Sequence, residues 1–208
     1  RWEELSPETR LAAASTRMRA LQGEPLSVRW RELDLLEGLV ASEVDGAGRI
    51  LDWRGRLAYA DEDFDSSAAL AEAAATRRAS ERGRLASLLN AATAWIELGA
   101  WPRVLDICHE VLRAPSASPR ARLRAEWFCR LVAYRSERAA AADLELIAAV
   151  GAYGDVAYEG LICLTEASIA WRGADWDTAR HLLNRAERFC AGEACLLYTS
   201  DAADEWIG

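Results

Sequence analysis

The densest group of side chains that could do chemistry is acidic and lies in the segment DEDFDSSAALAE, residues 61–72. Its carboxylates have the spacing of the ligands in a calcium-binding loop: Asp61, Asp63, Asp65 and Glu72. Ser66, however, replaces the glycine that permits the sharp turn of such a loop, and Phe64 stands where a packed aromatic is expected. Since acidic residues at a helix start act as caps and as partners of the helix dipole, we interpret the segment as a helix start and expect no metal site.

The other candidates for catalysis or metal binding are isolated. His109 and His181 are the only histidines, and each falls in the second helix of a predicted pair. Cys108 precedes His109, but neighbouring residues of a helix point in different directions, so a shared metal or a thiolate–imidazole couple is not expected. No cysteine forms a C-x-x-C pair, and no glycine-rich phosphate loop, G-x-S-x-G or H-E-x-x-H motif occurs. The sequence therefore predicts a non-enzymatic protein without a cofactor.

Composition argues against further classes of function. All 25 basic residues are arginine, which together with the alanine-rich segments indicates a GC-rich, bacterial genome. The net charge is −8, and residues 1–194 still carry −5, which argues against nucleic-acid binding by this segment because such proteins present basic patches. No apolar run approaches the length of about 18 residues that indicates a membrane span. The scattered cysteines are typical of a reducing compartment, so we expect a cytoplasmic location.

Helical periodicity defines the elements that must position these side chains. In residues 84–98 the apolar positions recur at intervals of three and four, with Ser80 as the predicted cap and Gly99 as the left-handed residue at the end. Residues 101–112 carry a second apolar stripe, and Pro102 suits the first turn. The connection between them is so short that the two helices must form an antiparallel pair.

The same helix pair recurs along the chain. The predicted breaks between paired helices lie 37 residues apart: Glu62, Gly99, Ser136 and Gly173. Large aromatics stand just past three of these breaks: Phe64, Trp101 and Trp176. At the third break Arg138 takes that place, so we interpret this repeat as degenerate. Such a constant interval indicates a repeat architecture.

The pattern resembles the tetratricopeptide repeat, with a period a few residues above the usual 34. The segment ASLLNAATAWIELGAWPRVLDICHEVLRAP carries the large and small positions of that motif: Leu88, Ala92, Trp95, Gly99, Trp101 and Val111. It departs from the motif at Val104, and Glu166 stands where a small residue is expected. The resemblance implies an all-α fold of antiparallel helix pairs, stacked as a right-handed solenoid with a period of about 37 over residues 48–194. Residues 1–47 are interpreted as a diverged helix pair.

The resemblance also implies where a partner would bind. In tetratricopeptide-like arrays the first helix of each pair lines the concave face. Carrying the pattern over by position gives these partner-contacting residues: Asp52, Arg56, Tyr59, Thr93, Glu97, Glu126, Arg130, Tyr134 and Trp171. Arginines, acids and aromatics suit a peptide or a partner helix, through charge-assisted hydrogen bonds and stacking. The alternative for each residue is a solvated, salt-bridged surface.

Two functional hypotheses follow. The first is a non-enzymatic protein–protein interaction or scaffold module that binds a peptide or partner helix. The second is a regulatory or sensory segment of a larger bacterial signalling protein, such as an ATP-binding transcription regulator or a kinase, by fold-level analogy. An upstream nucleotide-binding loop or a downstream helix-turn-helix would favour the second. An all-helical enzyme would need paired acidic motifs on facing helices, which we do not find.

The two ends of the sequence lead to a separate expectation. Met18 is the only methionine and the chain opens on Arg1, which predicts a natural start further upstream. After Gly192 the helical register stops, and CLLYTSDAADE, residues 195–205, resembles the translation of a sequencing-library adapter. We therefore expect a metagenomic fragment in which residues 195–208 are a non-native tail.

Overall fold

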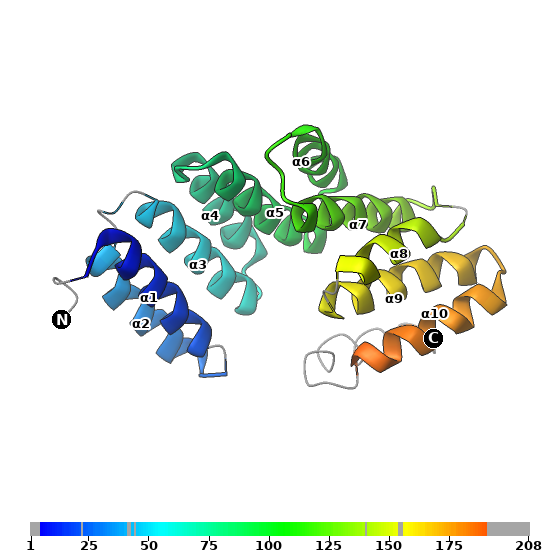
Figure 1. Cartoon of the computed structure of the whole chain (residues 1–208), viewed down its shortest axis with the longest axis horizontal. Coiled ribbons are helices and arrows are strands. Elements are labelled where there is room, and N and C mark those ends of the chain that lie inside the picture. The colour runs from blue at the N-terminus through cyan, green and yellow to red at the C-terminus, as the bar shows by residue number, and fades with distance from the viewer. Residues whose placement is uncertain are drawn as a thin grey trace. The chain divides into compact units, whose positions relative to one another are not determined.

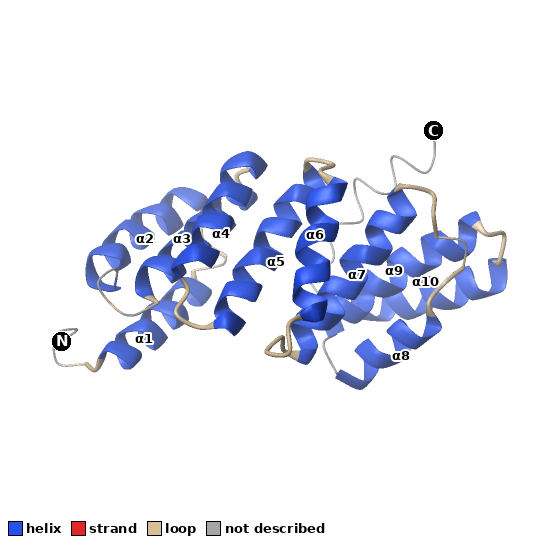
Figure 2. Ribbon diagram, turned by 90° about the horizontal axis from the view of Figure 1, so that it is seen from above, coloured by secondary structure: helices blue, strands red, loops and turns tan. Residues whose placement is uncertain are grey.

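The computed structural model describes residues 5–21, 23–40, 43, 45–139, 141–153 and 156–190. Within these ranges the chain folds into ten helices and no strand (Figure 1), as the colouring by secondary structure in Figure 2 also shows. The helices are α1 (Pro7–Ala20), α2 (Leu26–Val40), α3 (Gly46–Ala60), α4 (Phe64–Arg77), α5 (Glu81–Glu97), α6 (Trp101–Arg113), α7 (Pro119–Arg135), α8 (Leu144–Tyr153), α9 (Val156–Arg172) and α10 (Trp176–Cys190). The prediction of an all-α fold is confirmed.

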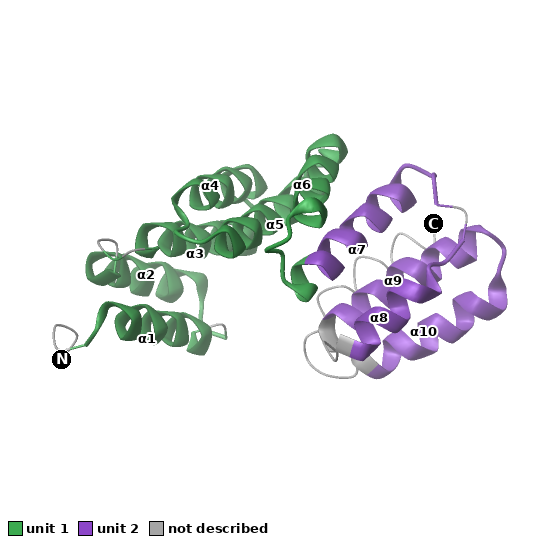
Figure 3. Cartoon of the chain, turned by 45° about the horizontal axis from the view of Figure 1, so that its top comes forward, with its two compact units in different colours: residues 1–121 green, residues 122–208 purple. Residues whose placement is uncertain are grey.

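The chain divides into two compact units (Figure 3). Unit 1, residues 1–121, holds α1 to α6, and each of these helices packs against the next. Unit 2, residues 122–208, holds most of α7 together with α8, α9 and α10, and α9 packs against both α8 and α10. The predicted pairs α3–α4, α5–α6 and α9–α10 are therefore in contact. The domain limits predicted at residues 48 and 195 stay predictions, and residues 195–208 lie outside the described residues.

The core of unit 1 begins with the first three helices. Its buried side chains are at most 9% exposed: Leu11, Ala14 and Met18 from α1, Leu33, Leu36 and Val40 from α2, and Ile50 and Leu57 from α3. Burial stabilises a large apolar side chain by roughly 1.5–3 kcal/mol over its exposed state. The helix pair predicted within residues 1–47 therefore shares one core with α3.

Four helix ends are built alike. The helices α3, α5, α7 and α9, here called the first helices, are each followed by a left-handed residue: Glu62 (φ 60°), Gly99 (φ 66°), Glu137 (φ 58°) and Ala174 (φ 60°). The next residue donates its N–H to the carbonyl five residues back, as in a Schellman motif: Asp63 to Ala58, Ala100 to Trp95, Arg138 to Ala133 and Asp175 to Ala170. Successive left-handed residues lie 37, 38 and 37 residues apart.

The predicted breaks agree closely with these turns. Glu62 and Gly99 are themselves the left-handed residues, whereas Ser136 and Gly173 each stand one residue before them. The sequence thus located all four helix ends, two of them at the left-handed residue itself and two within one position of it.

The acidic segment 61–72 starts a helix, as interpreted from its sequence. Asp63 caps α4 by accepting a hydrogen bond from the backbone N–H of Ser66 at 3.1 Å, and this bonding lowers its pKa. Glu72 Oε1 accepts hydrogen bonds from Trp95 Nε1 at 3.0 Å and Arg103 Nη2 at 2.9 Å. Two of the four acids of the calcium-like pattern are therefore engaged in capping and in contacts between helices.

The third hairpin has a longer connection than the others. The helices α4, α6 and α10 begin two residues after the left-handed residue, but α8 begins only at Leu144. Asp143 caps it by accepting a hydrogen bond from the N–H of Leu146 at 2.9 Å. Arg138, which stands where the other three repeats have an aromatic, therefore lies in the loop before α8 and not at the start of a helix.

Candidate functional site

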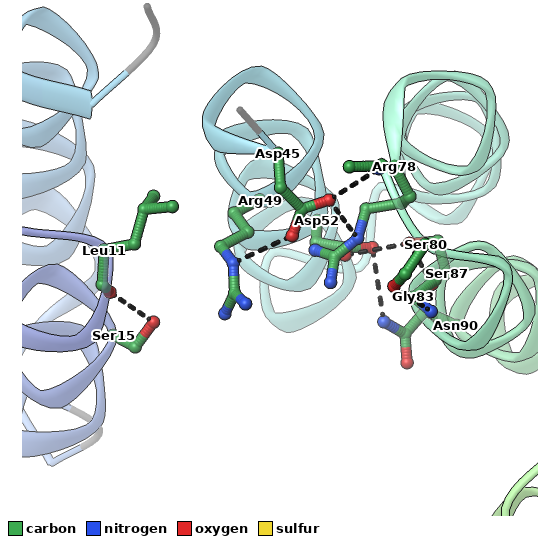
Figure 4. A network of polar contacts seen from close by, with 11 residues as sticks. Leu11, Ser15, Asp45, Arg49, Asp52, Arg78, Ser80, Gly83, Ser87 and Asn90 are labelled. Carbon is green, nitrogen blue, oxygen red and sulfur yellow. Dashed lines mark hydrogen bonds and ion pairs between the residues drawn. The ribbon is translucent and has the colours of Figure 1, made fainter. Parts of the chain in front are cut away.

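A polar cluster links three parts of unit 1 (Figure 4). This Asp52 cluster comprises Asp45 directly before α3, Asp52 of α3, Arg78 after α4, and Ser87 and Asn90 of α5. Asp52 Oδ2 accepts hydrogen bonds from Ser87 Oγ at 2.8 Å and Arg78 Nη1 at 3.2 Å, and Oδ1 accepts one from Asn90 Nδ2 at 3.4 Å. Arg78 Nε lies 3.1 Å from Asp45 Oδ1. The predicted contact residue Asp52 is thus satisfied inside the molecule.

Two small residues create the space for Arg78. A Cβ added at Gly48 would lie 2.8 Å from Arg78 Cδ and 3.1 Å from the carbonyl carbon of Arg77. One added at Gly83 would lie 2.7 Å from Arg78 Nε. Both distances to Arg78 are shorter than van der Waals contact allows. Glycine at these two positions therefore lets the guanidinium reach the carboxylates of Asp45, before α3, and Asp52, within it.

Burial changes the acidity of Asp52. Its side chain is 12% exposed, and desolvation raises its pKa, while the hydrogen bond from Ser87 and the charges of Arg78 and Arg56 oppose that rise. The carboxylate is thus held mainly by neutral donors and by one arginine at 3.2 Å. This environment stabilises the ionised form only partly.

The other predicted residues of unit 1 lie closer to the surface. The Tyr59 hydroxyl donates to Glu97 Oε1 at 2.8 Å, and its ring packs edge-on against Phe64 with 5.2 Å between ring centroids. Thr93 Oγ1 donates to the carbonyl of Leu89 at 3.0 Å. Arg56 and Glu97 are exposed. The structure therefore brings Tyr59 and Glu97 together across α3 and α5.

Unit 2 contains a tighter counterpart, here called the Glu166 cluster: Arg130, Ala141, Asp143 and Glu166. The Glu166 side chain is 0% exposed and accepts two hydrogen bonds from Arg130, at 2.8 Å from Nε and 2.6 Å from Nη2. The backbone N–H of Asp143 donates to the same carboxylate at 2.7 Å, and Arg130 Nη2 also donates to the carbonyl of Ala141 at 2.6 Å. The hydrogen bond to Glu166 raises the pKa of Arg130, so this predicted contact residue is a fully paired cation.

The Glu166 cluster explains an irregularity of the sequence. Glu166 stands where the repeat pattern calls for a small residue, and the longer connection before α8 includes both Ala141 and Asp143. The buried carboxylate and its arginine together bind the backbone of that connection at two points. The two departures from the pattern therefore compensate each other.

Further contacts join α7 to α9. Trp127 Nε1 donates to Thr165 Oγ1 at 3.0 Å. The guanidinium of Arg172 lies 4.1 Å from the ring centroid of Tyr134, and its Nη1 donates to the carbonyl of Tyr134 at 2.6 Å. The predicted contact residue Glu126 of α7 is exposed. Partial burial of its carboxyl and the nearby charge of Asp143 raise its pKa.

The contacts in the two units fall in the same register relative to the left-handed residues. Tyr59 and Tyr134 stand three residues before them, and their partners Glu97 and Arg172 stand two residues before the next ones. A second pair of hydrogen bonds lies nearer the starts of these helices and joins Asp52 to Asn90 and Trp127 to Thr165. Asp52 and Trp127 each stand ten residues before the left-handed residue of their own helix. Asn90 and Thr165 each stand nine residues before that of theirs. The contacts between α3 and α5 therefore involve the same repeat positions as the contacts between α7 and α9.

The last predicted residue, Trp171, lies at the end of α9. It stands three residues before Ala174, as Tyr59 stands before Glu62. Its ring packs edge-on against Trp176 with 4.6 Å between centroids and an angle of 83° between the planes. Both tryptophans are 49% exposed.

Burial raises the pKa of the Cys163 thiol to about 11, which keeps it protonated at neutral pH. His109 and His181 are exposed on α6 and α10. Among the described residues, no group of three or more histidine, cysteine or acidic side chains could hold a metal ion. Over the same residues, no helix combines the length and apolarity that crossing a membrane requires.

Comparison of the predicted site with the structure shows what the sequence did not reveal. Asp52, Tyr59, Arg130 and Tyr134 were predicted to face a partner, but each binds a side chain or backbone group of a neighbouring helix. The partners that were missed are Arg78, Ser87, Asn90, Glu166 and Arg172. Most of them stand 35–38 residues from the group they bind, so searching for complementary side chains at the repeat interval could have found them.

Comparison with known proteins assigns no family. No family model matches the chain, and neither a curated protein nor a solved structure matches it. The function must therefore be inferred from the geometry of this molecule.

Proposed function

We propose that the chain is a tetratricopeptide-like interaction module. In this proposal its helix pairs form a right-handed stack with a period of about 37 residues, and a peptide or partner helix binds to the side chains of the first helices. The module works by binding alone, without catalysis or a cofactor.

The observation that carries the proposal is the common register of the first helices. Equivalent positions of α3 and α7 contact equivalent positions of α5 and α9, and all four helices end in the same turn. Stacked helix pairs of this kind bury their apolar stripes against neighbours and leave one row of helices to form an extended binding surface.

The internal contacts narrow the set of residues that would meet a partner. Asp52 and Arg130 act as links between helices, because their charged groups bind neighbouring segments. Of the predicted contact residues in unit 1, Arg56 and Glu97 are exposed and Tyr59 is half-buried beside Glu97. An exposed guanidinium beside a tyrosine suits an acidic or aromatic side chain of a peptide.

The alternative proposal places the same module within a larger bacterial signalling protein, such as an ATP-binding transcription regulator or a kinase. It uses the first-helix face in the same way and differs only in what the module regulates. Sequencing the complete reading frame distinguishes the two, because a nucleotide-binding loop or a helix-turn-helix beside this segment supports the alternative.

Selection from a random peptide library displayed on phage tests the proposed face. The intact chain is immobilised, enriched peptides are synthesised with a fluorescent label, and Kd is measured by anisotropy. We expect Arg56→Glu to weaken binding of the enriched peptides by about tenfold or more, since losing a charge-assisted contact costs about 1.4 kcal/mol or more.

The matched control is Arg113→Glu, which makes the same charge change at an exposed position of α6, outside the first helices. Retained binding in the control together with loss in Arg56→Glu supports the proposal. Enrichment of no peptide, or equal loss in both variants, contradicts it.

A further inference from the structure

Two opposite charges lie on neighbouring first helices of unit 1. The positive one belongs to α3, where Asp52, Arg56 and Tyr59 recur at intervals of four and three and so share one face of the helix. Asp52 and Tyr59 both bind side chains of α5, so Arg56 lies between two contacts to that helix, and it is exposed. Its charge acts on Asp52, but within the part of the chain that the structure describes no hydrogen bond or ion pair engages its guanidinium.

The negative charge is that of Glu97, at the end of α5. The Tyr59 hydroxyl donates to Glu97 Oε1 at 2.8 Å, which holds the carboxylate beside α3, and Glu97 is exposed. A carboxylate that accepts one hydrogen bond from a neutral hydroxyl keeps its charge and can accept further bonds from a cation. This face of unit 1 therefore presents a cation on one first helix and an anion on the next.

This combination of charges is specific to α3 and α5. Six residues before the left-handed residue, Arg56 is the only charged side chain of the four first helices. Two residues before it, Glu97 is the only acidic one, since α7 and α9 carry Arg135 and Arg172 there. The pair of opposite charges is therefore a property of this part of the chain and not of the repeat.

The separation of the two charges limits the ligands that can bind both. Arg56 and Glu97 differ by four positions in the common register, which is roughly 6 Å along a helix, and packed helices lie about 8–10 Å apart. The charges are therefore on the order of 10–12 Å apart. Side chains on one face of an extended peptide lie roughly 9 Å apart at an interval of three residues and roughly 13 Å at four. Neighbouring side chains on a helical ligand are only about 5–6 Å apart.

We propose that this face binds an extended peptide segment that carries an acidic and a basic side chain three or four residues apart. The acidic side chain pairs with Arg56 and the basic one with Glu97. Such a site selects its partner by the order of the charges, because reversing them brings like charges together. The inference rests on the proposed function and adds to it the chemistry and spacing of the partner.

Parallel phage selections test this inference. The same random peptide library is selected on the intact wild-type protein and on the double variant Arg56→Glu with Glu97→Arg, in which the two charges are exchanged. The exchange suits the fold, because it sets an arginine beside Tyr59 as Arg172 is set beside Tyr134.

The control variant carries Asp106→Arg and Arg113→Glu, which exchange two exposed charges of α6, outside the first helices. We expect peptides enriched on the wild type and on the control to share one order of acid and base, at an interval of three or four residues. Those enriched on the double variant should carry the reverse order. For the wild type, Kd measured by anisotropy should be at least tenfold lower for an enriched peptide than for the same peptide with its acid and base exchanged.

Several outcomes overturn the inference while the interaction module itself stands: enriched peptides that lack the paired charges, pairs at an interval other than three or four, or the same order of charges on the wild type and the double variant. Enrichment of no peptide overturns both the inference and the proposed function. The comparison of an enriched peptide with its exchanged form uses only the unaltered protein, so the inference remains testable whatever the stability of the variants.

Discussion

The Asp52 cluster and the Glu166 cluster solve the same problem by different chemistry. Each places a carboxylate between two first helices, but Asp52 is held chiefly by a hydroxyl, an amide and one arginine contact at 3.2 Å. Glu166 is held by a bidentate arginine and a backbone N–H, all within 2.8 Å. Desolvation of a carboxylate must be offset either by neutral donors or by a full countercharge.

The difference follows from what each cluster must hold. In unit 1 the turns after the first helices are short, and Asp52 binds only side chains. In unit 2 the longer connection before α8 must be fixed as well, and the Arg130–Glu166 pair binds its backbone. An ion pair can direct several strong hydrogen bonds at once, which suits that second task.

The largest expected effect is that of breaking the ion pair. Arg130→Met leaves a buried carboxylate without its countercharge, which costs about 3–5 kcal/mol of unfolding free energy. A urea melt measures the loss. Pulsed alkylation locates it, because Cys163 in unit 2 and Cys108 in unit 1 are both 0% exposed and react only when their surroundings open.

We expect Cys163 to become reactive at lower urea in Arg130→Met while the labelling of Cys108 changes less. The double variant Arg130→Met with Glu166→Met should recover much of the stability, because it removes the orphaned charge. An unchanged urea midpoint in the single variant would contradict the described role of the pair.

The next effect is that of removing the carboxylate in unit 1. Asp52→Ala should lower the unfolding free energy by about 1–3 kcal/mol, since Ser87, Asn90 and Arg78 lose their shared acceptor. In this variant Cys108 should be exposed to alkylation before Cys163. Equal acceleration at both cysteines would show that the clusters stabilise the chain as a whole instead of each stabilising its own unit.

Substitutions in the turns after the first helices should change the unfolding free energy by about 1 kcal/mol, in opposite directions in the two units. Ala174→Gly in unit 2 should raise the unfolding free energy by about that amount, because glycine adopts the left-handed conformation without strain. Gly99→Ala in unit 1 should lower it similarly. Thermal denaturation measures both, and a stabilising Gly99→Ala would contradict the common geometry of the four turns.

A smaller effect depends on pH. The raised pKa of Asp52 means that the folded state binds this proton more tightly than the unfolded state, so the resulting stability is lost as the pH rises through the folded pKa. Asparagine mimics the protonated form. The deficit of Asp52→Asn relative to wild type should therefore shrink as the pH rises from below 3.8 to neutrality.

Asp63→Asn is the control of opposite sign. Capping lowers the pKa of Asp63, so its contribution is present at neutral pH and is lost as the pH falls. The deficit of that variant should grow with pH, and urea midpoints across the acidic range compare the two. Parallel trends would contradict the assignment for Asp52.

The smallest expected difference separates the two tyrosines. Tyr59 uses its hydroxyl, so Tyr59→Phe should lower the unfolding free energy by about 0.5 kcal/mol. Tyr134 offers its ring and carbonyl to Arg172, so Tyr134→Phe should change stability less. A larger loss of unfolding free energy in Tyr134→Phe would contradict the contacts described for the two tyrosines, even though they occupy equivalent positions in the repeat.

The sequence predicted those features of the fold that depend on neighbouring residues. Gly99, Ser80 and Pro102 mark helix ends through local backbone preferences, and all three act as expected. The candidate site was less predictable, because whether Arg130 faces solvent or Glu166 depends on the register between separate helices. The start of α8 was missed for the same reason, since Glu166 of a later helix binds the connection before it.

The position of Arg78 determines how unit 1 can be divided. It lies in the junction between α4 and α5, yet it binds the carboxylates of Asp45 and Asp52 through a space lined by Gly48 and Gly83. A shortened protein that starts after this junction would separate α5 from both its arginine and its acidic partner. The hairpins α3–α4 and α5–α6 are therefore one folding unit in spite of their repeat-like sequence, and stable truncations of this protein should keep residues 45–90 together.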